Sequence, residues 1–266
     1  MNWGNFYIFG ILSIINFLIS IFFVIKNKND ERIIKSAVIF SFIGIFIFLL
    51  FIIGFWIYME RPPLRTMGET RLWFSFFLSI IGITTYILWK NKIGLVFANI
   101  LSSIFIIINI FNVEIHYKTL MPALQSIFFI PHVAIYMLAY AMLSVAFILS
   151  IFSILKNEKE KKGYLDLIDN YVYVGTALLT IGMLLGALWA KEAWGDYWNW
   201  DIKESWALIT WFLFLCYIHY RLYKNHKHKI AVIIVIFAFV ALQMCWYGVN
   251  YLPHSENSIH LYNSDN

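Results

Sequence analysis

Charged residues are scarce in this sequence. Only 13% of its 266 residues are Asp, Glu, Lys or Arg, whereas 61% are hydrophobic and the mean hydropathy is +0.73. Soluble globular domains carry about 25% charged residues, so the composition excludes that class. It indicates a polytopic membrane protein instead.

Cysteine is also rare. The two residues, Cys216 and Cys245, lie in different apolar runs and form no C-x-x-C pair. Isolated thiols in apolar surroundings are most often small packing residues. Any thiol chemistry at the outer face would therefore have to be supplied by other proteins, and thiol-reducing proteins are expected as indirect partners.

Long apolar runs, by contrast, are abundant. About 20 helical residues cross a hydrocarbon core of about 30 Å, and a helix satisfies its own backbone hydrogen bonds in lipid, whereas a β-barrel would show short alternating segments. We therefore predict an all-α polytopic membrane protein of about eight transmembrane helices, with four spans in residues 1–112 and four in residues 113–266. The runs lie near residues 3–25, 34–59, 72–89, 93–112, 131–155, 171–190, 205–223 and 229–249.

The basic residues alternate from loop to loop. Loops 26–35, 90–92, 156–163 and 221–229 hold 14 of the 20 Lys and Arg residues. The positive-inside rule places these loops in the cytoplasm, and both termini and the remaining loops outside. The net charge of +5 then reflects orientation, and nucleic-acid binding is disfavoured. The first run lacks a basic start and a cleavage site, so we expect it to be retained as a span.

One of the outer loops is rich in tryptophan. The stretch WAKEAWGDYWNWDIKESWALITW, residues 189–211, holds six of the 11 tryptophans. It also carries six ionisable residues between Lys191 and Glu204, each of which would cost about 3 kcal/mol at the bilayer centre. Since Trp prefers the headgroup boundary, we predict an interfacial platform on the outer face, aromatic on one side and polar on the other. Such a surface suits a flat, mostly apolar ligand with charged edges, of which haem is an example.

Two histidines are candidate ligands of haem iron. His132 follows Pro131 in the opening turn of the fifth predicted span, with Tyr136 and Tyr140 on the same helical face. His219 lies in the inner half of the seventh span. Imidazole is the commonest haem ligand, but His132 could also be an ordinary surface residue. His219 could instead bond a neighbouring helix or extend to the inner membrane surface.

The outer loop from Glu60 to Trp73 carries Arg61, Arg65 and Arg71. These guanidinium groups could contact a carboxylate or a partner surface, or they could lie among the lipid headgroups as membrane anchors.

Several motifs resemble one known family. WGDYWNWDIKESWALITW is similar to the WWD domain of haem-handling proteins, and LMPALQSIFFIPHVAIYMLAY, YIHYR, and GVNYL followed by IHLY support the match. Together they resemble the CcsA (ResC) family of system II cytochrome c biogenesis over somewhat more than the C-terminal half. PPLRTMGETRLW extends the resemblance weakly into the first half.

The resemblance implies a multi-pass subunit of a holocytochrome c synthase, a lyase of the bacterial inner membrane, that works with a separate CcsB (ResB) protein. Haem b would enter from the inner leaflet and meet His219, with the second inner ligand coming from the partner. It would then be presented on the outer, periplasmic WWD loop between His132 and His260, for attachment to the C-x-x-C-H motif of an apocytochrome c. Because Leu261 replaces the family's usual serine, nearby His254 competes with His260 for this role. Ile202 replaces the family's usual proline, which a helix start tolerates.

The side-chain chemistry around these histidines suits haem by itself. Trp194, Trp198 and Trp200 would wall the porphyrin, and Lys203, Lys191 or an outer arginine would meet the propionates. Trp194 and Trp198 would share a face if the loop were helical.

Asp201 and Glu204 either pair with Lys203 or orient a ligand. Two other functions remain open. One is a haem-delivery module with no catalytic role. The other is a haem-b respiratory subunit, which would require paired histidines in two helices at both depths, a pattern that the sequence lacks.

Overall fold

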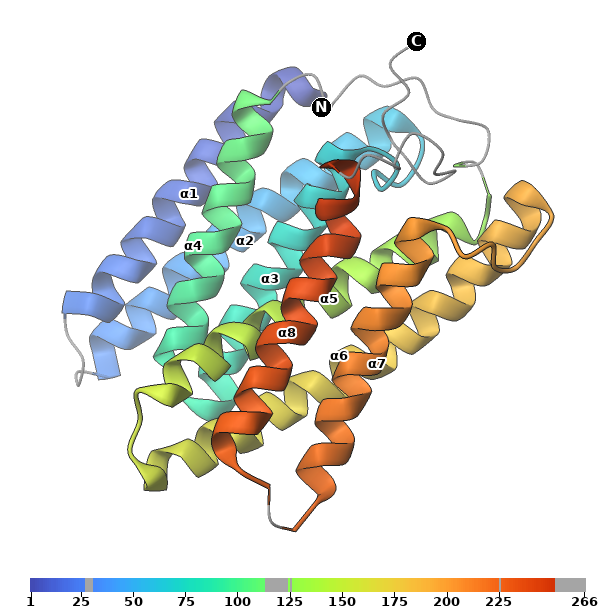
Figure 1. Cartoon of the computed structure of the whole chain (residues 1–266). Coiled ribbons are helices and arrows are strands. Elements are labelled where there is room, and N and C mark those ends of the chain that lie inside the picture. Colours follow the sequence, from blue (N-terminus) through green and yellow to red (C-terminus); the bar gives the residue numbers. More distant parts are fainter. Residues whose placement is uncertain (27–30, 113–123, 125, 225, 252–266) are drawn as a thin grey trace. The chain divides into compact units, whose positions relative to one another are not determined.

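In the computed structural model the described part of the chain folds into helices joined by loops (Figure 1). It describes residues 1–26, 31–112, 124, 126–224 and 226–251, and within these ranges it contains no strand. The helices, with a short 3-10 helix η3 after the last, are α1 Trp3–Lys26, α2 Glu31–Met59, α3 Met67–Trp89, α4 Lys92–Phe111, α5 Phe129–Ile154, α6 Glu158–Trp194, α7 Ile202–Leu222, α8 His228–Trp246 and η3 Gly248–Tyr251.

Seven of these helices are long and apolar enough to cross a membrane. Among the eight α-helices of the described residues, the exception is α7. At 21 residues it is about 31 Å long, enough to cross, but its sequence includes Trp211, Tyr217 and His219, whose side chains are partly polar. The prediction of an all-helical polytopic membrane protein is confirmed.

The chain separates into two compact units, Met1–Leu120 and Met121–Asn266. Within each unit four helices form a closed ring, because each helix packs against the next and the last packs against the first. The first ring is α1 to α4, and the second is α5 to α8.

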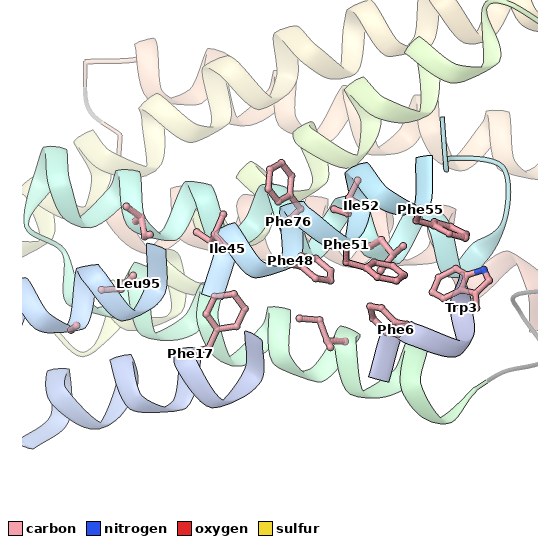
Figure 2. Close-up of a cluster of buried hydrophobic side chains, with 14 of the residues drawn as sticks. Trp3, Phe6, Phe17, Ile45, Phe48, Phe51, Ile52, Phe55, Phe76 and Leu95 are labelled. Atoms are coloured by element: carbon pink, nitrogen blue, oxygen red, sulfur yellow. The ribbon is translucent and has the colours of Figure 1, made fainter. Parts of the chain in front are cut away.

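Aromatic rings dominate the core of the first unit (Figure 2). Phe6, Phe51 and Phe55 are each at most 1% exposed, and the ring centroids of Phe6 and Phe51 are 4.9 Å apart. Phe22 and Phe42 lie on the outer faces of α1 and α2 and are exposed, as lipid-facing residues are. Since lipid tails are as apolar as these rings, close packing rather than exclusion of water holds the helices together.

A chain of hydrogen bonds crosses the same unit. Asn99 on α4 donates to the Ser41 hydroxyl on α2 at 2.6 Å, and Ser41 donates to Ser20 on α1 at 2.8 Å. In membranes such bonds contribute about 0.6 kcal/mol each. They join three helices at one level.

The loop between α2 and α3 is organised by Glu69, whose side chain is fully buried. Its carboxylate accepts two hydrogen bonds from Arg61, at 2.8 and 2.9 Å, and forms a capping box with Thr66 at the start of α3. Of the alternatives left open for the outer arginines, Arg61 makes a guanidinium–carboxylate contact, and it does so within the chain. Burial and the neighbouring Arg61 charge lower the pKa of Arg65, and Glu69 opposes that shift.

In the second unit α5 lies against glycines of α6. A Cβ atom added to Gly175 would lie 2.7 Å from the Leu143 side chain, and one added to Gly182 would lie 2.5 Å from the Tyr136 ring. Small residues allow this close approach, as the composition of the sixth predicted span suggested.

Helix α6 begins much earlier than predicted. The charge run near residues 156–163 is mostly exposed but is helical from Glu158, with Asn157 as the N-cap, and it is not the loop that we predicted. The ion pair between Lys161 and Glu158, at 2.6 Å and three residues apart, supports this first turn.

Candidate functional site

The tryptophan-rich loop joins α6 to α7 at one end of the second unit (Figure 1). Gly195, with φ of 92°, ends α6, and Asp201 caps α7 by accepting a hydrogen bond from the Lys203 backbone N–H at 2.7 Å. Trp194 therefore lies in the last turn of α6, whereas Trp198 lies in the non-helical segment that follows. The shared helical face that we considered for these two rings does not form.

Glu204 holds the backbone on both sides of Trp200. Its carboxylate accepts hydrogen bonds from the N–H groups of Asn199 at 2.8 Å and Asp201 at 3.1 Å. Trp200 itself has φ of 56°, a left-handed conformation that is uncommon for a bulky residue. Asp201 and Glu204 thus form a capping box at α7, a contact that was not among the alternatives considered for them, which were pairing with Lys203 and orienting a ligand.

This backbone turn presents the Trp200 ring outward. The residue is 69% exposed, and its ring meets that of Trp198 edge to face at 5.9 Å. The indole nitrogen of Trp198 is buried, and it has no hydrogen-bond partner within the described part of the chain. Lys191 steadies the same loop by donating to the Gly195 carbonyl at 2.5 Å.

His132 lies among aromatic rings in the first turn of α5. Its ring centroid is 4.5 Å from that of Tyr136 and 5.7 Å from that of Trp189, which is stacked at 30°. Trp189 also contacts Trp194 at 4.8 Å and Phe129 at 4.9 Å. His132 and Trp194, both predicted as site residues, therefore share one aromatic neighbour.

The aromatic contacts continue along α5. The rings of Tyr136 and Tyr140 stack 5.6 Å apart, which confirms the common face predicted for them, and Tyr140 meets Trp246 of α8 at 5.5 Å. The Tyr140 hydroxyl lies 3.8 Å from the Cys245 sulfur, which lies 3.6 Å from the Lys203 carbonyl oxygen. The middle of α5 and the start of α7 are thereby connected through the end of α8.

Two polar contacts fix the position of His132 and of the segment before it. The imidazole Nδ1 is 2.7 Å from the Gly182 carbonyl oxygen of α6. Just ahead of α5, the Ser126 hydroxyl donates to Glu192 in the last turn of α6. The contribution of Glu192 had no signal in the sequence, because its partner lies 66 positions away.

His219 lies near the opposite end of α7, about 26 Å along the helix from Ile202. It is exposed, and its Nδ1 lies 2.9 Å from the Leu215 carbonyl oxygen of its own helix. On a different face of α7, Tyr217 and Arg221 both bind Asp169 of α6, at 2.7 Å and 2.6 Å. The bond to a neighbouring helix, one of the alternatives considered for His219, is thus made by Tyr217 and Arg221 instead.

The described contacts therefore join His132 to Trp194 through Trp189 and pair Trp198 with Trp200, and they leave His219 at a separate place. His254 and His260 lie outside the described residues.

Comparison with known proteins identifies the family of this chain. The model of the cytochrome C assembly protein family matches residues 3–255. The chain belongs to this family. Relatives of this chain named cytochrome c biogenesis protein CcsA include those of Guizotia abyssinica, 33% identical over 79% of this chain and 82% of that relative, and Trieres chinensis, 31% identical over 94% of each. The CcsA of Chlamydomonas reinhardtii is 34% identical over 76% of this chain, but only 62% of its own length is covered.

Among solved structures, the cytochrome c haem lyase CcmF superposes with a TM-score of 0.67. The match covers 92% of this chain and 46% of CcmF at 14% sequence identity, so it establishes a common fold. The chain thus spans less than half the length of that lyase.

Proposed function

We propose that this chain, a cytochrome c assembly family member, presents haem b at the tryptophan-rich loop for covalent attachment to an apocytochrome c. The observation that carries the proposal is the set of contacts that the His132 imidazole makes. Its imidazole is held by α6 and lies beside Trp189, which also contacts Trp194 at the end of α6, where the tryptophan-rich loop begins. An imidazole among flat apolar rings suits an iron porphyrin.

Other residues of the proposed outer site would contact the porphyrin ring and the propionates of the haem. Trp194, Trp198 and Trp200 would line the porphyrin, and the buried Trp198 indole N–H is a donor that a propionate could satisfy. Lys203 would supply a cation for the propionates, and Asp201 would keep it in place by capping α7.

His260 is the proposed second iron ligand at the outer site, with His254 as the competitor. His219 is the proposed inner ligand. Its exposed position on α7, away from the face that binds Asp169, suits an iron whose other ligand comes from a separate CcsB (ResB) protein.

In the proposed reaction the two thiols of the C-x-x-C-H motif add across the two haem vinyl groups. Each sulfur bonds to one carbon of a double bond and each hydrogen to the other, so the step needs no oxidant. The residues named here would bind, orient and shield the haem. The proposed location is the bacterial inner membrane, with the tryptophan-rich loop and both termini outside, because the alternate loops hold 14 of the 20 Lys and Arg residues.

The test is covalent attachment in cells that lack their own attachment system. The full chain is co-expressed with a CcsB-type partner and an apocytochrome c, and covalently bound haem is measured by in-gel peroxidase staining. His132→Ala and His260→Ala should each abolish the stained cytochrome. His228→Ala should not, since His228 lies 3.0 Å from the Ser153 hydroxyl, outside the proposed sites. Normal attachment in both ligand variants would contradict the proposal, and bound haem without attachment by the native chain would favour the delivery module.

A further inference from the structure

We infer that Gly186 is a positioning residue for the proposed outer site, and that it makes Nε2 of His132 the nitrogen that binds iron. The inference rests on the proposed function, because it assigns the ligand atom of the same histidine. The start of α5 contacts glycines of α6, and these contacts support the role of Gly186.

The imidazole tautomer follows from one hydrogen bond. The Gly182 carbonyl oxygen can only accept, and it lies 2.7 Å from Nδ1 of His132. In neutral imidazole one nitrogen is a donor and the other an acceptor, so the proton is on Nδ1 and the lone pair is on Nε2. Iron-binding histidines commonly donate their other ring N–H to a carbonyl or carboxylate in this way, which fixes the ring and makes the ligand more basic.

The absence of a side chain at Gly186 permits that bond. A Cβ atom there would lie 2.7 Å from Cε1 and 2.9 Å from Nδ1 of His132, closer than real Cβ contacts, but 3.6 Å from Nε2. The hydrogen-bonding edge of the ring therefore lies against the bare backbone of α6, and the ligand nitrogen lies farther from it. With alanine at this position the ring would have to move.

The ring has little room to move while keeping its bond. Tyr136 lies on one side at 4.5 Å between centroids, and Trp189 stacks on the ring at 5.7 Å. Displacement from Gly186 would lengthen the bond to Gly182 and turn Nε2 away from its native direction. Loss of such an orienting partner typically lowers metal affinity or activity about 10–100-fold.

Gly175 offers a matched control on the same helix. A Cβ atom there would also lie 2.7 Å from a side chain of α5, but that side chain is Leu143, which has no ligand role. Both Gly→Ala changes crowd the same pair of helices. Only Gly186→Ala touches the imidazole.

The experiment measures haem binding by the purified full-length chain, expressed with its CcsB-type partner, using absorption spectra and pyridine haemochrome quantitation. Gly186→Ala should weaken haem binding at the outer site at least about 10-fold, and imidazole added to the buffer should restore the low-spin spectrum. Gly175→Ala should retain the native spectrum. His132→Gly provides the reference for a missing ligand that imidazole can replace.

The outcomes separate the two proposals. A native spectrum in Gly186→Ala would overturn the positioning role while leaving His132 as a ligand if His132→Gly loses haem. Equal loss in Gly186→Ala and Gly175→Ala without imidazole rescue would also overturn it, because crowding of α5 against α6 would explain both. Native haem in His132→Gly would refute the proposed function, and the inference with it.

Discussion

Asp169 joins α6 to the C-terminal half of α7, and Asp169→Ala should destabilise the protein by about 3–5 kcal/mol. The carboxylate accepts hydrogen bonds from the Tyr217 hydroxyl at 2.7 Å and from two nitrogens of Arg221 at 2.6 and 2.9 Å. The side chains of Arg221 and Asp169 are only 9% and 13% exposed, so the pair is not weakened as surface pairs are. The alanine variant would leave the Arg221 charge without its carboxylate in a poorly solvated place.

The assay is equilibrium unfolding in detergent micelles, followed by tryptophan fluorescence and extrapolated to zero denaturant. Glu158→Ala removes a carboxylate from the same helix, but that side chain is 87% exposed, and its loss should shift the transition midpoint only slightly. The double variant Asp169→Leu with Arg221→Leu should recover most of the stability, because no unpaired charge remains. If Asp169→Ala shifts the midpoint no more than Glu158→Ala does, the account of how α7 is held is wrong.

Two further changes test the loops at the helix starts. Arg61→Ala should lower the free energy of unfolding by about 3–5 kcal/mol in the same assay, because Glu69 is fully buried and would lose its cation. A change below about 1 kcal/mol would show that the pair behaves as an exposed one. Glu204→Ala should cost about 1.5–3 kcal/mol, since a carboxylate that bonds two backbone N–H groups beside Trp200 is lost. Asp196→Ala, an exposed change in the same loop, is the control, and equal effects of the two would contradict the role given to Glu204.

The approximate positions of the helices could be predicted from the sequence because long apolar runs mark most of them. The run near residues 72–89 became α3 Met67–Trp89, and the error at its start has a simple cause. Thr66 and Glu69 have the spacing of a capping box, which marks a helix start that hydropathy does not show. Asp201 and Glu204 have the same spacing, and reading it would have placed the start of α7 at Ile202.

The candidate site was only partly predictable. Its residue types and the common face of His132, Tyr136 and Tyr140 follow from motif and helical period, both of which are local. The contact of His132 with Gly182 and the bond between Ser126 and Glu192 depend on how α5 packs against α6. Such contacts between distant segments leave no periodic signal in a single sequence, so only the structure reveals them.

We propose that this chain binds haem iron through His132, and the absorption spectrum of the purified full-length chain, expressed with a CcsB-type partner, reports on that bond. The native chain should show low-spin b-type haem, and His132→Ala should lose the part of the spectrum that belongs to the outer site. His228→Ala should keep it. An identical haem content and spectrum in the native chain and in His132→Ala would contradict the claim, and the tryptophan-rich loop would then have to be explained as a protein-docking surface.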